Sequence, residues 1–259
     1  MCGRFVASRP VEEIARALGV DEVDVPPELL SPRWNVAPQA RVLAVSETRH
    51  EPGVRRLSAF RWGLVPWWAK DPSIGARAFN AKAETVKDKP MFRNAIERQR
   101  CVIPVDAFYE WAPAPEGGPT RRRQPWCFKA PGSGLLLLGG LWEQWRARDD
   151  QSEAQSAPPL FTCTILTVDA NGPVARVHDR MPLLIAEEDL EEWLSPEPLA
   201  AVDLGRLIRP APSEALEAFR VSTRVNDARQ EGPDLAEPIE PPAQGASGVG
   251  EGSGEAQLL

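Results

Sequence analysis

The sequence predicts an α+β fold in which a strongly twisted, partly closed (barrel-like) and mainly antiparallel β-sheet is surrounded by a few helices. Two observations support this class: apolar, β-rich segments outnumber segments with helical periodicity, and clusters of Pro and Gly separate them. A chain of 259 residues that is 42% hydrophobic can bury the core of one large domain. We therefore predict one domain over residues 2–226 and a tail over residues 227–259.

Three segments show the pattern of a short amphipathic helix. Residues 8–20 begin with Ser8, a residue type that caps helices, and end beside Gly19. Residues 89–100 and 187–194 carry their apolar side chains on one face. These segments supply the few helices of the predicted fold.

Six segments have the apolar, β-branched composition of strands. They are residues 41–46, 57–65, 101–109, 135–141, 160–168 and 219–225. We expect Pro104 to interrupt the third strand, because proline cannot donate a ladder hydrogen bond. Residues 113–124 are rich in Pro and Gly and predict a hairpin loop, with residues 121–123 as a solvated arginine tip.

The charge of the chain is unevenly distributed. The formal net charge is −7, which at first disfavours a nucleic-acid binder. Residues 1–150 carry +5, however, while residues 151–225 and 226–259 each carry −6. The basic N-terminal part is compatible with a local DNA groove. Residues 227–259 are acidic and rich in Pro and Gly, so we expect them to be disordered.

The cysteines and the hydropathy pattern restrict the cofactors and the compartment. The four cysteines form no CxxC pair and there are only two histidines, so we expect neither a metal site nor another cofactor. No apolar run is long enough to span a membrane, and the N-terminus lacks the pattern of a signal peptide. We therefore expect a cytoplasmic protein, with no membrane partner and no disulfide framework.

Cys2 gives the N-terminus a specific chemical reactivity. Removal of Met1 makes Cys2 the first residue, and its α-amine then has a reference pKa of about 7.7–8.0. A 1,2-aminothiol of this kind condenses with an aldehyde: the amine forms an imine and the thiol closes a five-membered thiazolidine ring. Position alone is weak evidence, because an early cysteine is more often a buried structural residue.

Six short motifs follow one another along the chain. They are CGRF at residues 2–5, NVAP at 35–38, WGLVPWW at 62–68, FNAKAET at 79–85, FYEW at 108–111 and HDRMP at 178–182. In this order they resemble the SOS response-associated peptidase family, whose members shield abasic sites in DNA. The resemblance spans residues 2–226, and the six motifs together are highly specific although each alone is weak.

The resemblance implies four catalytic residues. It carries the nucleophilic cysteine onto Cys2, an amide onto Asn80, a carboxylate onto Glu110 and an imidazole onto His178. Glu110 between aromatic neighbours suits a proton shuttle, and His178 can donate a proton to the sugar oxygen. Without the resemblance, a salt-bridged carboxylate, a turn asparagine and a loop histidine would be the favoured interpretations.

The resemblance also implies a single-stranded DNA partner and a set of DNA-binding residues. These are Arg4, Asn35, Pro38, Trp67, Trp68, Lys82, Thr167 and Arg180, in which rings stack on unpaired bases and cations contact phosphates. If Trp67 and Trp68 lie in a strand, only one of them can face the DNA. Lys82 replaces the arginine usual in the family, so a point charge replaces a bidentate fork. We expect a monomer.

Two other functions fit part of the sequence. An N-terminal-nucleophile hydrolase, such as a glutamine amidotransferase domain, also begins with MCG, but it gives no role to FYEW and HDRMP. A peptidase that removes its own first residue is a milder variant. A non-covalent reader of modified bases would keep the aromatic groove and tolerate the loss of Cys2.

Overall fold

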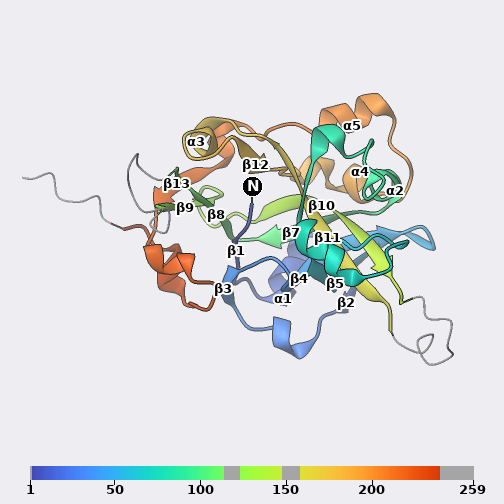
Figure 1. Cartoon of the computed structure of the whole chain (residues 1–259), viewed down its shortest axis with the longest axis horizontal. Helices are drawn as coiled ribbons and strands as arrows, with labels where there is room; N and C mark the ends of the chain where they lie inside the picture. The colour runs from blue at the N-terminus through green and yellow to red at the C-terminus, as the bar shows by residue number, and fades with distance from the viewer. Residues whose placement is uncertain (1, 114–122, 148–157, 240–259) are drawn as a thin grey trace, which may run out of the picture.

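The computed structural model describes residues 2–113, 123–147 and 158–239 and shows two sheets with short helices at their edges (Figure 1). Most strand pairs in both sheets are antiparallel, which confirms the predicted α+β class. The expected arginine tip at residues 121–123 lies largely outside the described residues, which resume at Arg123. In the described part of the chain, no helix is both long and apolar enough to span a membrane.

The smaller sheet contains five strands in the order β13-β9-β8-β1-β3. Their bounds are β1 Phe5–Ala7, β3 Arg33–Val36, β8 Ala107–Trp111, β9 Pro125–Lys129 and β13 Glu217–Arg220. The N-terminal strand β1 lies inside this sheet, where it pairs with β8 on one side and β3 on the other. The position of the N-terminus is therefore fixed by strand pairing.

The larger sheet has the order β12-β11-β10-β7-β4-β5-β2, and β6 pairs with β11 outside this path. The bounds are β2 Glu22–Asp24, β4 Arg41–Thr48, β5 Glu51–Trp62, β6 Asn80–Lys82, β7 Arg100–Val105, β10 Leu136–Trp145, β11 Leu160–Asp169 and β12 Arg180–Pro182. A parallel contact between β5 and β11 curls the sheet into a partial ring without closing a barrel. This matches the predicted partly closed sheet.

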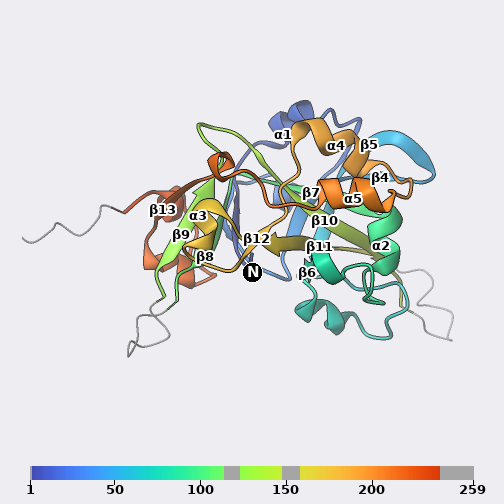
Figure 2. The same ribbon diagram turned by 90° about the horizontal axis from the view of Figure 1, so that it is seen from above.

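The helices are short and peripheral. The α-helices are α1 Val11–Ala17, α2 Arg93–Arg98, α3 Gly172–Ala175, α4 Leu190–Leu194 and α5 Ala201–Leu207. The 3-10 turns are η1 Pro27–Leu29, η2 Pro72–Arg77, η3 Ala83–Thr85, η6 Glu187–Asp189, η7 Ser213–Ala215, η8 Thr223–Asn226 and η9 Pro233–Ala236. Figure 2 shows α2, α4 and α5 grouped beside the larger sheet, and α3 beside β8 and β9.

Two predicted element boundaries are wrong for a shared reason, the carboxylate of Asp106. Ser8 does not cap α1; its backbone N–H donates to Asp106 Oδ2 at 2.7 Å instead. The strand predicted over residues 101–109 breaks at Asp106 and not at Pro104, which stays in β7 opposite Leu137. A side chain that satisfies backbone groups of another segment leaves no periodic signal in the sequence.

The strand predicted over residues 57–65 ends earlier, at Trp62, and a tight turn follows. Gly63 has a φ of +146°, and a Cβ there would lie 2.4 Å from the carbonyl oxygen of Gly75. Only glycine allows this close approach of two backbones. Trp67 and Trp68 therefore lie in a turn, and the expectation that only one of them is accessible is wrong: both are exposed.

Residues 227–239, predicted to be disordered, are packed on the smaller sheet. Leu235 in η9 is fully buried, and the N–H of Ile239 donates to the carbonyl oxygen of Arg220 at 2.9 Å. The Asn35 amide donates to the carbonyl oxygens of Asp227 and Gln230, both at 3.0 Å. The predicted domain boundary at residue 226 is therefore too early, because this segment supplies its own apolar anchor and backbone acceptors. Residues 240–259 lie outside the described residues.

Candidate functional site

The four predicted catalytic residues come from both sheets. Cys2 and Glu110 belong to the smaller sheet, just before β1 and within β8, whereas Asn80 and His178 belong to the larger sheet, in β6 and just before β12. Figure 1 shows β1 leading up to the middle of one face, between these two groups of strands. The fold thus gathers four residues that are far apart in the sequence.

Strand pairing sets Glu110 beside the N-terminus. In the β1–β8 pair, Phe5 is opposite Phe108, and the N–H of Tyr109 donates to the carbonyl oxygen of Arg4 at 2.9 Å. Continuing this antiparallel register places Glu110 opposite Gly3, next to Cys2. The Coulombic influence of Glu110 on the Cys2 thiol is consistent with this proximity.

Cys2 is completely buried. Burial, together with the nearby carboxylate of Glu110, raises the pKa of its thiol to about 12, against a lowering by the positive N-terminus. The thiol is therefore protonated at neutral pH and must lose its proton as it reacts. Its carbonyl oxygen accepts a hydrogen bond of 2.7 Å from Asn80 Nδ2, so β6 holds the backbone of Cys2.

The other polar atom of the Asn80 side chain is its amide oxygen. Its Oδ1 atom is buried and has no hydrogen-bond donor among the described residues. A buried acceptor without a donor is costly, so a donor from a substrate or from a freed amine would be stabilised there. Asn80 reaches this position because β6 pairs in parallel with β11, with Asn80 opposite Ile165.

Glu110 is a buried carboxyl group. Burial raises its pKa, and the N-terminus and His178 oppose that rise. A carboxyl group whose pKa moves upward can hold a proton at a pH where an exposed glutamate is ionised. This is the behaviour required of a group that both gives and takes a proton.

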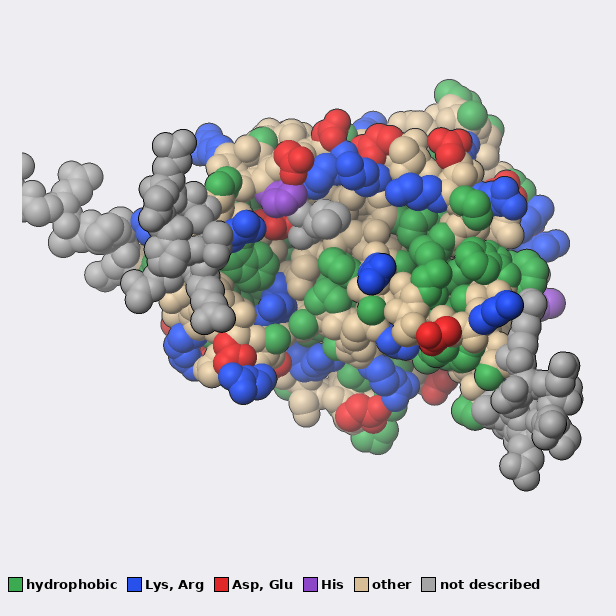
Figure 3. All heavy atoms as spheres, in the orientation of Figure 1, with side chains coloured by type: hydrophobic (Ala, Val, Ile, Leu, Met, Phe, Trp, Pro, Cys, Tyr) green, Lys and Arg blue, Asp and Glu red, His purple; other side chains and the backbone are tan. Residues whose placement is uncertain are grey.

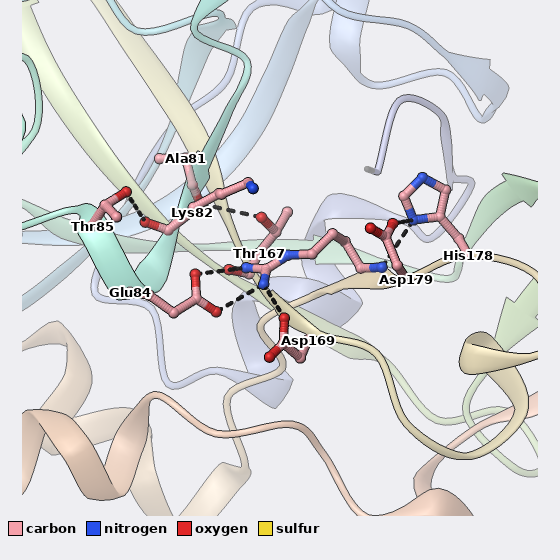
Figure 4. Close-up of polar contacts among 9 residues, drawn as sticks. Ala81, Lys82, Glu84, Thr85, Thr167, Asp169, His178 and Asp179 are labelled. Carbon is pink, nitrogen blue, oxygen red and sulfur yellow. Dashed lines mark hydrogen bonds and ion pairs between the residues drawn. The ribbon is translucent and has the colours of Figure 1, made fainter.

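His178 is held by its own turn. Its Nδ1 atom lies 2.9 Å from the N–H of Arg180 and 2.8 Å from Asp179 Oδ1 (Figure 4). These contacts fix the ring through Nδ1, and Nε2 lies on the opposite side of the ring. The imidazole is partly exposed and lies near enough to Glu110 to influence its charge.

Arg180 links the strands that carry the site. Its guanidinium forms ion pairs with Glu84 at 2.8 Å and with Asp169, and it donates to the carbonyl oxygen of Thr167 at 2.5 Å (Figure 4). The Thr167 hydroxyl is itself buried and lies 3.4 Å from the carbonyl oxygen of Ala81. Both residues were predicted to bind DNA; the structure places them in internal contacts, where they orient β6, β11 and β12.

Arg4 and Asn35, also predicted to bind DNA, contact each other. Arg4 donates to Asn35 Oδ1 at 2.7 Å and to the carbonyl oxygen of Val225 at 3.0 Å, and its guanidinium lies 5.7 Å from the ring centroid of Trp111. Desolvation lowers the pKa of Arg4. This pair ties β1 to the C-terminal segment, so its role in DNA binding stays a prediction.

The other predicted DNA contacts are accessible. Trp67 and Trp68 are 49% and 39% exposed, Lys82 is exposed, and Pro38 is half-buried after β3. Figure 3 shows basic side chains across the middle of this face and hydrophobic side chains gathered to its right. Exposed aromatic rings beside positive charge are the features that single-stranded nucleic acid requires.

The structure also shows functional candidates that the sequence analysis missed. Glu143 lies within the apolar strand β10 and accepts a hydrogen bond of 2.9 Å from the N–H of Trp67. Burial raises its pKa to about 6. Glu143 is the only charged residue of β10, and a lone charge after an apolar run is the sequence signal that could have identified it. No cluster of His, Cys, Asp or Glu in the described ranges could hold a metal ion.

Comparisons with known proteins identify the family of the chain. Residues 1–228 match the family model described as SOS response associated peptidase (SRAP). The chain is 35% identical over 237 residues to the abasic site processing protein YoqW of Bacillus subtilis, covering 92% of this chain and 99% of the relative. It is 30% identical over 276 residues to the abasic site processing protein HMCES of Gallus gallus, covering 93% and 78% of the two chains.

A crystal structure of a protein from Bacteroides thetaiotaomicron has the same fold, with a TM-score of 0.76 and 22% identity, covering 92% of this chain and all of that one. The family model covers most of the chain, and relatives with more than 30% identity span nearly its full length. The chain therefore belongs to the SOS response associated peptidase (SRAP) family.

Proposed function

We propose that this protein captures abasic sites in single-stranded DNA by forming a covalent thiazolidine between Cys2 and the open-chain aldehyde of the lesion. The observation that carries the proposal is the convergence of Cys2 with the buried carboxyl group of Glu110, the imidazole of His178 and the amide of Asn80. Relatives named abasic site processing proteins support the substrate class. Removal of Met1 is required, because it frees the α-amine.

The chemistry balances without an oxidant or a metal. The neutral α-amine of Cys2 attacks the aldehyde carbon, and the resulting carbinolamine loses its hydroxyl group as water to give an iminium. The thiol sulfur then attacks the same carbon, and its proton leaves to a nearby base. The product is a five-membered ring with new C–N and C–S bonds, formed with the net loss of one water.

We assign to Glu110 both proton transfers, to the leaving hydroxyl group and from the thiol. Its raised pKa, caused by burial, lets the acid form donate to the leaving hydroxyl group. The carboxylate that remains accepts the proton of the Cys2 thiol, whose own pKa of about 12 prevents spontaneous ionisation. One group therefore serves as acid and then as base, as in other general acid–base catalysis.

Asn80 positions Cys2, and His178 supplies a second proton. Asn80 fixes the carbonyl group of Cys2 at 2.7 Å and offers Oδ1 to a donor of the amine or the sugar. His178, anchored through Nδ1, presents Nε2 to protonate the sugar ring oxygen as the ring opens. The exposed rings of Trp67 and Trp68 hold the neighbouring bases.

The experiment that tests the proposal is incubation with single-stranded DNA that carries one abasic site, followed by a denaturing gel. The native protein forms a heat-stable complex, and a tetrahydrofuran analogue without an aldehyde forms none. Cys2→Ser keeps the amine but cannot close the ring through sulfur, so it gives only an imine that borohydride traps. A variant with an extra residue ahead of Cys2 gives neither product; normal crosslinking by that variant would refute the N-terminal mechanism.

A further inference from the structure

A second concave site lies on the larger sheet, among residues of β4, β5, β10 and β11. Two adjoining cavities of about 440 and 550 Å³ share Thr48, Arg56, Trp142 and Phe161. Because they share these walls, we name the two cavities together the aromatic groove.

The walls of this groove are aromatic. Phe60, Trp142 and Phe161 form a triad with ring centroids 5.9 to 6.3 Å apart. Phe161 is 38% exposed, although the next residue of β11, Thr162, is fully buried. Trp67, one of the predicted DNA contacts, lines the 550 Å³ cavity, so the groove is continuous with the proposed DNA face.

Polar groups in the wall are arranged to recognise a planar ligand. The indole N–H of Trp142 is buried and has no acceptor among the described residues, although Trp142 lines both cavities. The side chain of Gln99 bonds to Glu143 on the floor beside Trp67. A heteroaromatic ring with an acceptor on its edge would stack on Phe161 and satisfy this donor.

Both cavities carry charges of both signs at their rims. Arg49, His50 and Arg98 border the 550 Å³ cavity, together with Glu51 and Glu97. Glu51 is engaged by Arg56 in an ion pair. The 440 Å³ cavity is bordered by Glu22, Asp24, Arg41 and Arg56, with Arg56 paired to Glu22 at 2.6 Å. At the rim of the 550 Å³ cavity, Arg49 and Arg98 offer positive charge to the phosphates of a bound strand.

We propose that the 550 Å³ half of the aromatic groove binds an unpaired base of the same DNA strand that is held at Cys2, stacked between Trp67 and Phe161 with its phosphates toward Arg49 and Arg98. This inference rests on the proposed function and adds to it a base subsite beyond the lesion. The subsite acts by stacking, so it accepts any of the four bases. A strand must be long enough to reach the subsite in order to bind with full affinity.

The test uses unreactive tetrahydrofuran oligonucleotides that carry the fluorescent base 2-aminopurine at successive positions on each side of the lesion. In the native protein, one position is quenched by stacking in the groove. Phe161→Ala restores its fluorescence and weakens binding about 5- to 100-fold, the range for loss of one base stack, but only for strands long enough to reach the groove. Val23→Ala, an exposed change in the other cavity, leaves both readouts unchanged.

The outcomes separate this inference from the proposed function. If Phe161→Ala changes neither quenching nor affinity while native protein still crosslinks abasic DNA, the groove is not a base subsite. Binding of a free deoxynucleotide that needs Phe161 but is independent of strand length would overturn the assignment to the bound strand. A loss of folding is detected by the melting temperature; Phe161→Leu then provides an apolar side chain without a stacking face, and it must reproduce the loss of quenching.

Discussion

At the scale of single residues, the proposed mechanism assigns proton transfer and DNA binding to different side chains. Glu110 is buried near Cys2, whereas the rings of Trp67 and Trp68 are exposed at the surface. A residue that moves protons and a residue that stacks on bases must therefore fail in different ways when they are replaced.

Glu110→Ala removes the proposed proton shuttle and leaves the exposed aromatic rings in place. We expect crosslinking to slow by about 10²- to 10⁴-fold, the usual contribution of a general acid–base group, while non-covalent binding of undamaged single-stranded DNA stays nearly normal. The measurement is a crosslinking time course beside a binding titration, with the melting temperature as a folding control. A parallel loss of binding and crosslinking would identify Glu110 as an architectural residue.

The four predicted reactive residues are assigned by the family motifs that contain them, because their residue types alone favour structural roles. The assignment of Cys2, Asn80, Glu110 and His178 stays a prediction. Arg4, Asn35 and Arg180 also belong to motifs, yet their charges and amides are engaged within the fold. Sequence spacing does not show whether an arginine meets a phosphate or a carboxylate of its own chain.

At the scale of elements, the C-terminal segment behaves as part of the domain. Residues 227–239 bury Leu235 and accept hydrogen bonds from Asn35, which in turn contacts Arg4 in the N-terminal segment. Its low hydrophobicity made it resemble a disordered tail. One leucine and a few backbone carbonyls are enough to order a segment when a preformed sheet receives them.

A pair of truncations tests this segment. A chain ending at residue 239 retains the melting temperature of the full chain. A chain ending at residue 226 loses the burial of Leu235, a contribution of about 1.5–3 kcal/mol, and melts at a lower temperature. Leu235→Ala in the full chain lowers the melting temperature in the same direction. Equal melting temperatures for the two truncated chains would contradict the packed arrangement.

Glu143 in strand β10 makes the free energy of unfolding depend on pH. Its folded-state pKa is raised from 4.5 to about 6 by burial, so the folded chain binds more protons than the unfolded chain in that interval. The free energy of unfolding therefore falls as pH rises from about 4.5 to about 6, a loss of about 2 kcal/mol from this group. The contribution is complete below pH 4.5 and lost above pH 6.

Glu143→Gln removes the ionisable group while keeping an acceptor for Trp67. We expect the difference in stability between pH 4.5 and pH 7 to shift, by about this amount, relative to the native protein. Denaturant unfolding at both pH values measures it, and Glu13→Gln on the exposed face of α1 is the matched control. An unchanged pH profile in Glu143→Gln would show that the carboxyl group ionises as freely in the folded chain as in the unfolded chain.

At the scale of the whole molecule, the site exists only because two sheets meet. Apolar periodicity predicts the strands and the mixed class, since it depends on local residue types. It does not predict that β6 pairs in parallel with β11, or that β1 pairs between β3 and β8. These non-local pairings bring Asn80 to the carbonyl group of Cys2 across 78 positions of sequence.

The central claim is tested most directly by locating the bond in the DNA–protein adduct. The native protein is incubated with an abasic single strand, digested with nuclease and protease, and mapped by mass spectrometry. The account predicts a modification confined to the N-terminal peptide that begins at Cys2, with a mass equal to the sugar remnant less one water. A modification on an internal lysine such as Lys82, or on a peptide that retains Met1, would contradict it.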